Sequence, residues 1–207
     1  MIADKILALY DEKKEEYHEH ILGAYTRYIK EVSSFQMAAS LECCGFLMAA
    51  YDYLKPRNIL DLGSGISSFV LRKFKHDNGL YTDIWSVDTD EHWLEKSKNF
   101  SASRGLDAEN FYLWTDIEHK LKPFDLIFFD MDKSQNRGKY YDTVFRNCAE
   151  EGCVVIVDDY HKEVTRSAVE PMVEKYGFKT RKLKSLTDKL RRYQMVLHKR
   201  PTGVQGE

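Results

Sequence analysis

The sequence predicts an α/β fold, with a doubly wound sheet of seven strands that is mostly parallel, a C-terminal antiparallel hairpin and added N-terminal helices. Three observations predict it. The first fifty-odd residues place apolar side chains at helical spacing, and short apolar runs then alternate with helix-length segments. Those runs are apolar at every position, which is typical of parallel strands covered on both faces.

The N-terminal segment predicts two helices. Along the first, apolar residues recur at three- and four-residue spacing: Tyr17, Ile21, Tyr25, Tyr28 and Val32. We interpret this tyrosine stripe as core packing rather than as a cofactor site. The stretch LECCGFLMAAYDYL predicts a second, buried helix that ends before Lys55 and Pro56.

Five apolar runs then predict the parallel strands: NILDL (58–62), IWSVD (84–88), FYLW (111–114), FDLIFFD (124–130) and CVVIVDD (153–159). Two later runs, GFKTRKL and YQMVLHK, are close enough in the chain to pair as a hairpin at the end of the sheet. We therefore expect one domain, residues 1–200, in which 1–55 form a helical substrate and cofactor cap and 56–200 a Rossmann-like core. Residues 201–207 are expected to be a flexible tail.

Composition excludes several classes of function. The chain has 207 residues and a net charge of −2, so no charge excess favours nucleic acid or an anionic membrane as partner. The longest apolar run is too short to span a bilayer, and no signal peptide is evident. The four cysteines lack zinc-ligand spacing, which favours a reducing cytoplasm. The basic stretch KTRKLKSLTDKLRRY is interpreted as a solvated face of the terminal hairpin in preference to a site for a phosphate-bearing substrate or RNA.

Ligands of such sheets bind at the carboxyl ends of the strands. The first strand ends in Asp61, followed by Gly63, Ser64 and Gly65, where glycines allow a tight turn and close approach to a ligand. The second strand ends in Asp88, which is placed to accept hydrogen bonds from both hydroxyls of a ribose. Alone, Asp88 could equally cap the next helix; together with the glycine turn it favours a nucleoside.

The type of nucleoside follows from the residues around the turn. Ser68 stands where dinucleotide sites carry a third glycine, and no GxxxxGK[ST] motif for a nucleotide triphosphate is present. Asp61 would place negative charge beside a pyrophosphate, whereas S-adenosylmethionine carries a sulfonium and an ammonium group that nearby acids stabilise. The pattern therefore favours S-adenosylmethionine.

A second acidic group follows the fourth and fifth strands, which are expected to be neighbours. Asp130 follows one, and Asp158 and Asp159 the other. Clustered carboxylates repel one another unless a positive group lies between them, and oxygen ligands favour hard divalent ions such as magnesium. In the alternative interpretation, Asp130 contacts the cofactor and the other two cap the following helix.

ILDLGSG followed by SVD resembles the first two motifs of class I S-adenosylmethionine-dependent methyltransferases, and WTD at 114–116 resembles their third-strand segment. The resemblance implies S-adenosyl-L-methionine as cofactor and a set of residues that bind it: Asp61, Gly63, Ser64, Gly65, Asp88, Thr89, Thr115, Asp116 and Asp130.

Within that class, DMDK at 130–133 and the acidic pair resemble the cation-dependent O-methyltransferases of the catechol and caffeoyl-CoA kinds. The resemblance implies a divalent cation, magnesium, bound by Asp130, Asp158 and Asp159, although Asp159 stands where that family usually has asparagine. The cation would bind two adjacent oxygens of the acceptor and acidify one hydroxyl, and Lys133 would take its proton.

Three functions stay open at this stage. The favoured one is cation-dependent O-methylation of a small molecule with vicinal oxygens, such as a catechol. The second is a metal-independent small-molecule methyltransferase in which Asp130 and Lys133 perform acid–base work. The third is a non-catalytic S-adenosylmethionine-binding module. Acceptor selection is expected in the N-terminal helices, near 36–42, in SQNRGKYY at 134–141 and in the segment after Asp159. The sequence does not predict the oligomeric state.

Overall fold

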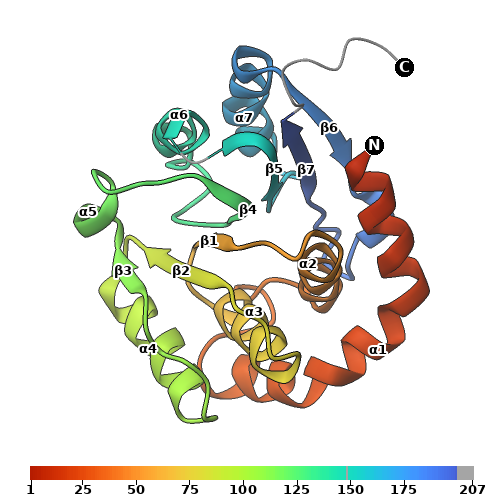
Figure 1. The fold of residues 1–207 in the computed structure, drawn as a ribbon, viewed down its shortest axis with the longest axis vertical. Coiled ribbons are helices and arrows are strands. Elements are labelled where there is room, and N and C mark those ends of the chain that lie inside the picture. The colour runs from red at the N-terminus through yellow and green to blue at the C-terminus, as the bar shows by residue number, and fades with distance from the viewer. Residues whose placement is uncertain (148, 200–207) are drawn as a thin grey trace.

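The computed structural model describes residues 1–147 and 149–199, and the predicted tail at 201–207 lies outside them. The strands are β1 (Asn58–Leu62), β2 (Asp83–Asp88), β3 (Phe111–Leu113), β4 (Phe124–Phe129), β5 (Ala149–Val157), β6 (Phe178–Lys182) and β7 (Met195–Lys199). They form one seven-stranded sheet in the order β3-β2-β1-β4-β5-β7-β6 (Figure 1). Strands β1 to β5 are parallel, and β7 runs antiparallel to both of its neighbours, β5 and β6. The predicted sheet and hairpin are confirmed.

The helices are α1 (Ile2–Glu31), α2 (Leu41–Leu54), α3 (Ile66–Asp77), α4 (Glu91–Ala102), α5 (Trp114–Ile117), α6 (Gly138–Asn147) and α7 (Glu163–Tyr176), with a 3₁₀ turn, η1, at Lys184–Leu186. The two predicted N-terminal helices are confirmed. Tyr17, Ile21, Tyr25 and Tyr28 are buried, as the helical spacing predicted. Ser40 caps α2 by accepting a hydrogen bond from the Cys43 amide at 3.0 Å.

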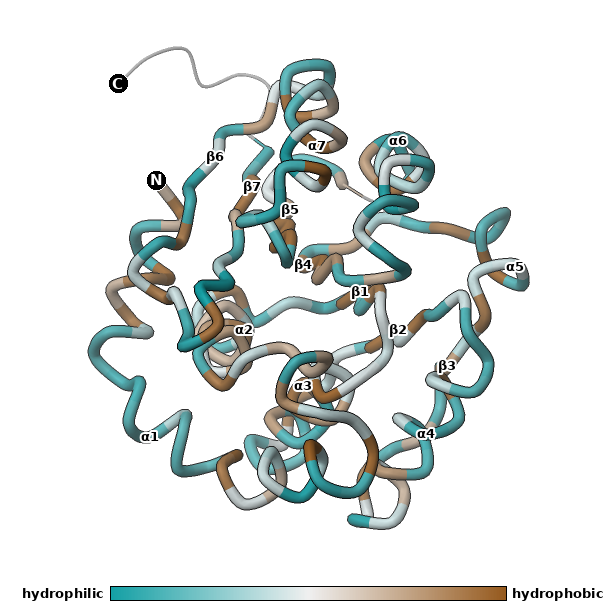
Figure 2. The backbone as a smooth tube through the Cα atoms, turned by 180° about the vertical axis from the view of Figure 1, so that it is seen from behind, coloured by the Kyte–Doolittle hydropathy of each residue, from teal (hydrophilic) through white to brown (hydrophobic). Residues whose placement is uncertain are grey.

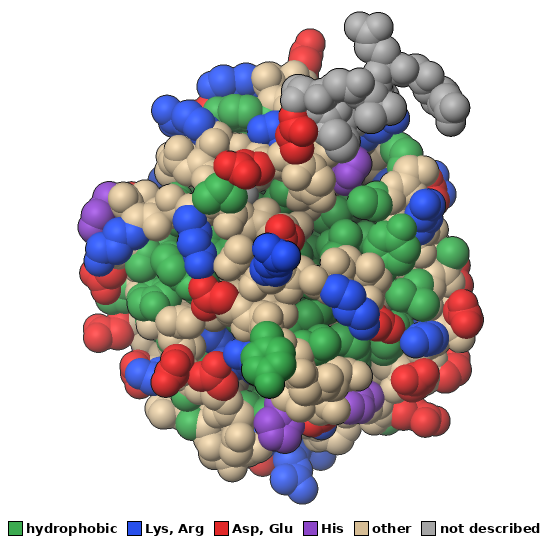
Figure 3. All heavy atoms as spheres, viewed as in Figure 1, with side chains coloured by type: hydrophobic (Ala, Val, Ile, Leu, Met, Phe, Trp, Pro, Cys, Tyr) green, Lys and Arg blue, Asp and Glu red, His purple; other side chains and the backbone are tan. Residues whose placement is uncertain are grey.

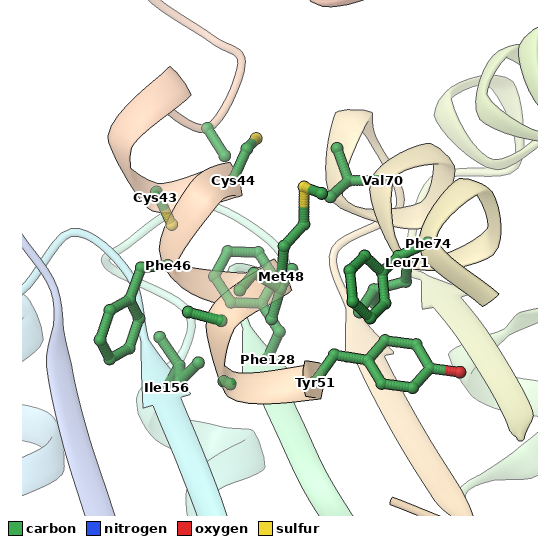
Figure 4. Packing of buried hydrophobic residues seen from close by; sticks show 14 of the residues in the cluster. Cys43, Cys44, Phe46, Met48, Tyr51, Val70, Leu71, Phe74, Phe128 and Ile156 are labelled. Atoms are coloured by element: carbon green, nitrogen blue, oxygen red, sulfur yellow. The ribbon is translucent and has the colours of Figure 1, made fainter. Parts of the chain in front are cut away.

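The core lies on both faces of the sheet. On one face, side chains of α1, α2 and α3 pack against the central strands, and Figure 4 shows Met48 and Phe46 of α2 beside Phe128 of β4 and Ile156 of β5. On the other face, Tyr141 and Phe145 of α6 belong to a second cluster of buried side chains with β1, β4 and β5. Since both faces are covered, successive strand residues are buried alternately on either side, which explains the continuous apolar runs.

Two elements differ from their predicted form. The third strand ends at Leu113, and Trp114 opens the short helix α5 with a side chain that is buried against Tyr140, ring centroids 5.1 Å apart. The fifth strand begins earlier than predicted, at Ala149, and its pairing with β4 is irregular between Phe124 and Leu126. Gly152 lies within this strand, at φ +83°.

The surface carries mixed charges. On the face shown in Figure 3, Lys and Arg side chains are interspersed with Asp and Glu. The tube of α1 alternates between hydrophilic and hydrophobic residues in Figure 2, as expected for a helix with one buried side. Among the described residues, no helix is both long enough and apolar enough to cross a membrane. Cys43, Cys44 and Cys153 are buried.

Candidate active site at the carboxyl ends of the strands

The turn after β1 brings three strand ends together. Gly63 adopts φ +105°, and a Cβ atom there would lie 2.6 Å from the carbonyl carbon of Asp130. The Asp130 amide donates to the Leu62 carbonyl at 2.6 Å, and the Gly63 amide donates to the Val87 carbonyl at 2.8 Å. Gly63 is thus required by the close approach of β4. Gly65 is different, because its backbone is extended and an added Cβ would make only ordinary contacts, with the Tyr28 hydroxyl at 3.6 Å and the Gly63 carbonyl oxygen at 3.9 Å.

Asp61 lies beneath this turn and is fully buried. Its Oδ1 accepts a hydrogen bond from Ser67 at 2.8 Å, and its Oδ2 accepts from Ser68 at 2.5 Å and Ser86 at 2.9 Å. The buried Arg72 donates in turn to the Ser86 hydroxyl at 2.7 Å. Burial raises the pKa of Asp61, and the three hydroxyl donors oppose that shift. Through these hydrogen bonds, Asp61 stabilises the turn and the start of α3. Its predicted contact with the cofactor stays a prediction.

Asp88 is the acid that faces the turn. Its Oδ2 accepts from the Ser64 hydroxyl at 2.9 Å, and its Oδ1 from the amides of Thr89 and Asp90 at 2.8 and 3.1 Å. Helix α4 is capped instead by Asp90, whose side chain accepts from the His92 amide at 2.9 Å. The capping alternative for Asp88 is therefore wrong. Burial raises the pKa of the Asp88 carboxyl above its ordinary value.

The remaining predicted cofactor residues lie around this edge. Thr89 is exposed directly after β2. Thr115 and Asp116 are also exposed, and both lie in α5 rather than at a strand end. Their predicted contacts with the cofactor depend on how α5 projects from β3 and remain predictions.

The three predicted metal ligands do converge, but around an arginine. The Arg137 Nη2 atom donates to the Asp130 carboxylate at 2.5 Å and to the Asp130 carbonyl at 3.0 Å, and it lies 3.3 Å from Asp159 Oδ2. Its Nη1 donates to the carbonyl of Asp158 at 3.3 Å and its Nε to that of Asp132 at 3.2 Å. The Arg137 side chain is 4% exposed. One guanidinium thus joins the loops after β4 and β5.

The two acids after β5 have further partners. Asp158 Oδ1 accepts from the Gln194 side-chain amide at 2.8 Å. Asp159 Oδ2 accepts from Lys162 Nζ at 2.7 Å and from the Ser134 hydroxyl at 3.3 Å. Helix α7 starts at Glu163 without a side-chain cap, so neither acid caps it. The capping role in that alternative interpretation is therefore wrong, and the predicted contact of Asp130 with the cofactor stays a prediction.

Charge is divided unequally within this cluster. Burial raises the pKa of Asp130 well above its usual range, with Arg137 opposing the shift. Burial also raises the pKa of Asp158, with the neighbouring Asp159 adding to it. For Asp159, burial is outweighed by Arg137 and Lys162, so its pKa is lowered. Of the three carboxyl groups, that of Asp159 therefore has the strongest tendency to be ionised.

The loop that carries Lys133 is organised by Asp132, a residue to which the sequence assigned no role. Asp132 adopts φ +63°, and its Oδ1 accepts from the Lys133 amide at 2.6 Å and from Asn136 Nδ2 at 3.0 Å. Its Oδ2 accepts from the Tyr140 hydroxyl at 3.1 Å. Lys133 itself is exposed at the edge of the site. Its predicted role as a base remains a prediction.

These contacts test whether the acids fit a divalent cation. Such an ion needs several carboxylate or carbonyl oxygens directed at one point. Here the Asp130 and Asp159 carboxylates and the Asp158 carbonyl are directed at a guanidinium, and Gln194 occupies an oxygen of Asp158. Among residues 1–147 and 149–199, no group of three or more His, Cys, Asp or Glu side chains is arranged to hold a metal. This arrangement does not fit the predicted ion.

Sequence reasoning missed several residues of this site. Arg137 lies in a polar stretch without periodicity, and Gln194 precedes the last strand, far from Asp158 in the chain. Arg192 Nη1 donates to the carbonyls of Gln36 and Ala38 at 3.1 and 2.8 Å, and so fixes the segment expected to select the acceptor. The only available signal was the type of residue, since Arg is the cation best suited to pair with carboxylates.

Comparisons with known proteins support the architecture. No family model and no curated protein sequence matches the chain. Among solved structures, the O-methyltransferase TomG from Streptomyces achromogenes, in complex with SAM, is 17% identical, with 86% of this chain and 89% of that chain covered at a TM-score of 0.63.

Two further structures agree. An O-methyltransferase from Bacillus cereus in complex with SAH is 17% identical, covering 88% of this chain and 89% of its own at a TM-score of 0.62. The SAH-bound Podospora anserina methyltransferase PaMTH1 is 14% identical, covering 88% and 87% at a TM-score of 0.63. Together with the strand order and the glycine turn after β1, these likenesses show that the chain has the class I S-adenosylmethionine-dependent methyltransferase fold.

Proposed function

We propose that this protein is an enzyme that transfers the methyl group of S-adenosylmethionine to an oxygen atom of a small-molecule acceptor. The observation that carries the proposal is the convergence of Gly63, Asp88 and Asp130 at one edge of a sheet with this fold. The structural likeness to O-methyltransferases, two of them bound to SAM or SAH, supports it.

The cofactor would bind over the turn after β1. The Asp88 carboxylate, which accepts from the Ser64 hydroxyl, would accept charge-assisted hydrogen bonds from the ribose hydroxyls. The tight turn at Gly63 lets the backbone approach the cofactor. Asp130, whose side chain is 22% exposed, would face the positively charged half of the cofactor.

Methyl transfer then needs a positioned acceptor and a base. The acceptor oxygen would attack the methyl carbon in line while the carbon–sulfur bond breaks, leaving S-adenosylhomocysteine. The acceptor proton would pass to the Asp130 carboxylate, whose raised pKa makes it a stronger base than an ordinary aspartate, or to the exposed Lys133. Both residues lie in the segment directly after β4.

A second candidate is the magnesium-dependent reaction on a catechol-like acceptor with vicinal oxygens. Its support is the proximity of Asp130, Asp158 and Asp159, the three acids predicted to bind the cation. The arrangement of these acids around Arg137 counts against it. No step of the reaction above passes through a metal.

Calorimetry and a methyl-transfer assay test the proposal together. We expect S-adenosylhomocysteine to bind saturably, and labelled methyl from S-adenosylmethionine to reach a member of a panel of phenols, catechols and aliphatic alcohols. Transfer in the presence of EDTA supports the first candidate, and transfer only with added magnesium supports the second. Binding with no transfer to any panel member would favour a non-catalytic binding module, and failure to bind would contradict all three.

Affinity for the cofactor product should depend on Asp88 and on pH. Loss of hydrogen bonds to a charged group predicts that Asp88→Ala weakens binding of S-adenosylhomocysteine on the order of 10–100-fold. Because burial raises the pKa of Asp88, wild-type affinity should fall as the pH is lowered from neutral toward that raised pKa, since protonation removes an acceptor.

Asp88→Asn provides the matched control for the pH effect, because its side chain cannot titrate. Calorimetry at several pH values should show a reduced affinity for Asp88→Asn that changes less with pH than that of the wild type. Equal pH dependence in the two proteins would assign the titration to another group and contradict the role of Asp88.

A further inference from the structure

The position of Arg137 carries an inference about how the acidic cluster is neutralised. Its guanidinium contacts all three residues predicted to bind the cation: Asp130 through both carboxylate and carbonyl, Asp159 through the carboxylate and Asp158 through the carbonyl. A further bond to the Asp132 carbonyl fixes its orientation. Arg137 therefore lies at the centre of the cluster, with most of its donors used.

A guanidinium at this place competes directly with a divalent cation. The two would repel each other over the few ångströms that separate ligands in one site. The donors of Gln194 and Lys162 bind the same group of carboxylates, at 2.8 Å on Asp158 and 2.7 Å on Asp159. An incoming ion would have to displace Arg137 from a buried ion pair, which is costly because the arginine would lose its partners.

The charge of the cluster is nearly balanced without any ion. Three carboxyl groups face two positive side chains: Arg137 contacts Asp130 and Asp159, and Lys162 contacts Asp159. A dication is therefore not needed to relieve the repulsion among the acids. The same balance explains why Asp159 can replace the asparagine usual in cation-dependent relatives.

We infer that Arg137 is a built-in cation at the place where the sequence predicts a divalent ion, and that it makes the methyl transfer of this protein independent of metal. The inference rests on the proposed function and specifies it. Arg137 is a positioning residue, because it holds the Asp130 carboxylate at the edge of the site without reaching the acceptor. Without an ion to bind two oxygens, the acceptor needs only one hydroxyl and no vicinal pair.

The inference also predicts what removal of the arginine should expose. In Arg137→Gln the three acids lose their central cation, so the site should gain affinity for a divalent ion. Arg137→Lys keeps the positive charge but has fewer hydrogen-bond donors than arginine. This variant should bind metal no better than the wild type. Arg146→Gln removes an exposed arginine of α6 that pairs with Asp142 and serves as control.

Thermal unfolding and calorimetry test this on protein saturated with S-adenosylhomocysteine. For the wild type we expect no saturable heat with magnesium or manganese, and no change of melting temperature with either ion or with EDTA. Arg137→Gln should melt roughly 10 °C lower and regain much of that loss when manganese is added, while Arg146→Gln should melt within about 2 °C of the wild type.

Saturable magnesium binding by the wild type that Asp158→Ala abolishes would overturn the inference. A folded Arg137→Gln without any response to metal would overturn it as well. If Arg137→Gln does not fold, the wild-type titration and Arg137→Lys decide, and metal binding by either overturns it. The heat of S-adenosylhomocysteine binding is recorded in the same samples, so failure of the proposed function would be seen separately from failure of this inference.

Discussion

Replacing Gly63 with alanine should destabilise the protein by roughly 3–5 kcal/mol, a large part of the ~5–15 kcal/mol that stabilises a typical domain. Two physical terms add. Alanine is strained at φ +105°, and its Cβ would lie 2.6–2.8 Å from backbone atoms of Asp130 and Met131. Because those atoms belong to the backbone at the end of β4, they cannot move aside as a flexible side chain can. Urea unfolding followed by circular dichroism measures the free energy.

Two other glycines separate the terms. Gly79 has φ +60° with nothing within 4 Å of an added Cβ, so Gly79→Ala should show only the conformational cost, about 1 kcal/mol. Gly65 has an extended backbone, and the atom nearest to an added Cβ would be the Tyr28 hydroxyl, at an ordinary contact distance of 3.6 Å. Gly65→Ala should therefore be nearly neutral for stability. If all three variants lose the same free energy, the close approach of β4 to Gly63 is not what requires glycine there.

Removing the carboxylate of Asp61 should have a comparable effect. Asp61→Ala leaves three buried hydroxyl groups without their acceptor and the buried Arg72 without the carboxylate that does most to raise its pKa. Breaking a buried charged network by removing one partner typically costs about 3–5 kcal/mol. We expect the midpoint of urea unfolding to fall accordingly, and affinity for S-adenosylhomocysteine to fall with it, because the turn that binds the cofactor rests on this network.

Asp61→Asn and Asp116→Ala complete the comparison. Asparagine keeps an acceptor oxygen but loses the charge, so Asp61→Asn should lie between wild type and Asp61→Ala. Asp116 is an exposed acid, and Asp116→Ala should change the free energy of unfolding by less than about 0.5 kcal/mol. An Asp61→Ala protein as stable as Asp116→Ala would show that the hydrogen bonds around Asp61 are not important for the fold.

The sequence was sufficient for the parts of this molecule that depend on local pattern. Continuous apolar runs predict strands buried on both faces, and the carboxyl ends of neighbouring strands predict that Asp130, Asp158 and Asp159 converge. Both predictions follow from the geometry of parallel sheets and are confirmed. The predicted third strand was one residue too long because Trp114 is buried. In the sequence, an apolar residue at the start of a short helix resembles one more strand position.

The partners of the acids could not be predicted in the same way. Arg137 reaches the cluster because Asp132 turns the loop at φ +63° and binds Asn136, and no periodicity encodes that path. Gln194 meets Asp158 only because β7 lies beside β5, a pairing between distant parts of the chain. A cluster of like charges predicts that some cation is present, but only the three-dimensional path of the loop identifies which one.

The place of β7 in the sheet sets an order for biosynthesis. β7 lies between β5 and β6, although it follows both in the chain. While the nascent chain is still leaving the ribosome, β5 therefore presents an open edge, and β6 has no strand to pair with until residues 195–199 emerge. The strands that carry the cofactor turn can assemble earlier. The acidic cluster acquires the hydrogen bond from Gln194 only after β6 has been synthesised. The turn after β1 and the acidic cluster after β4 and β5 are therefore completed at different times.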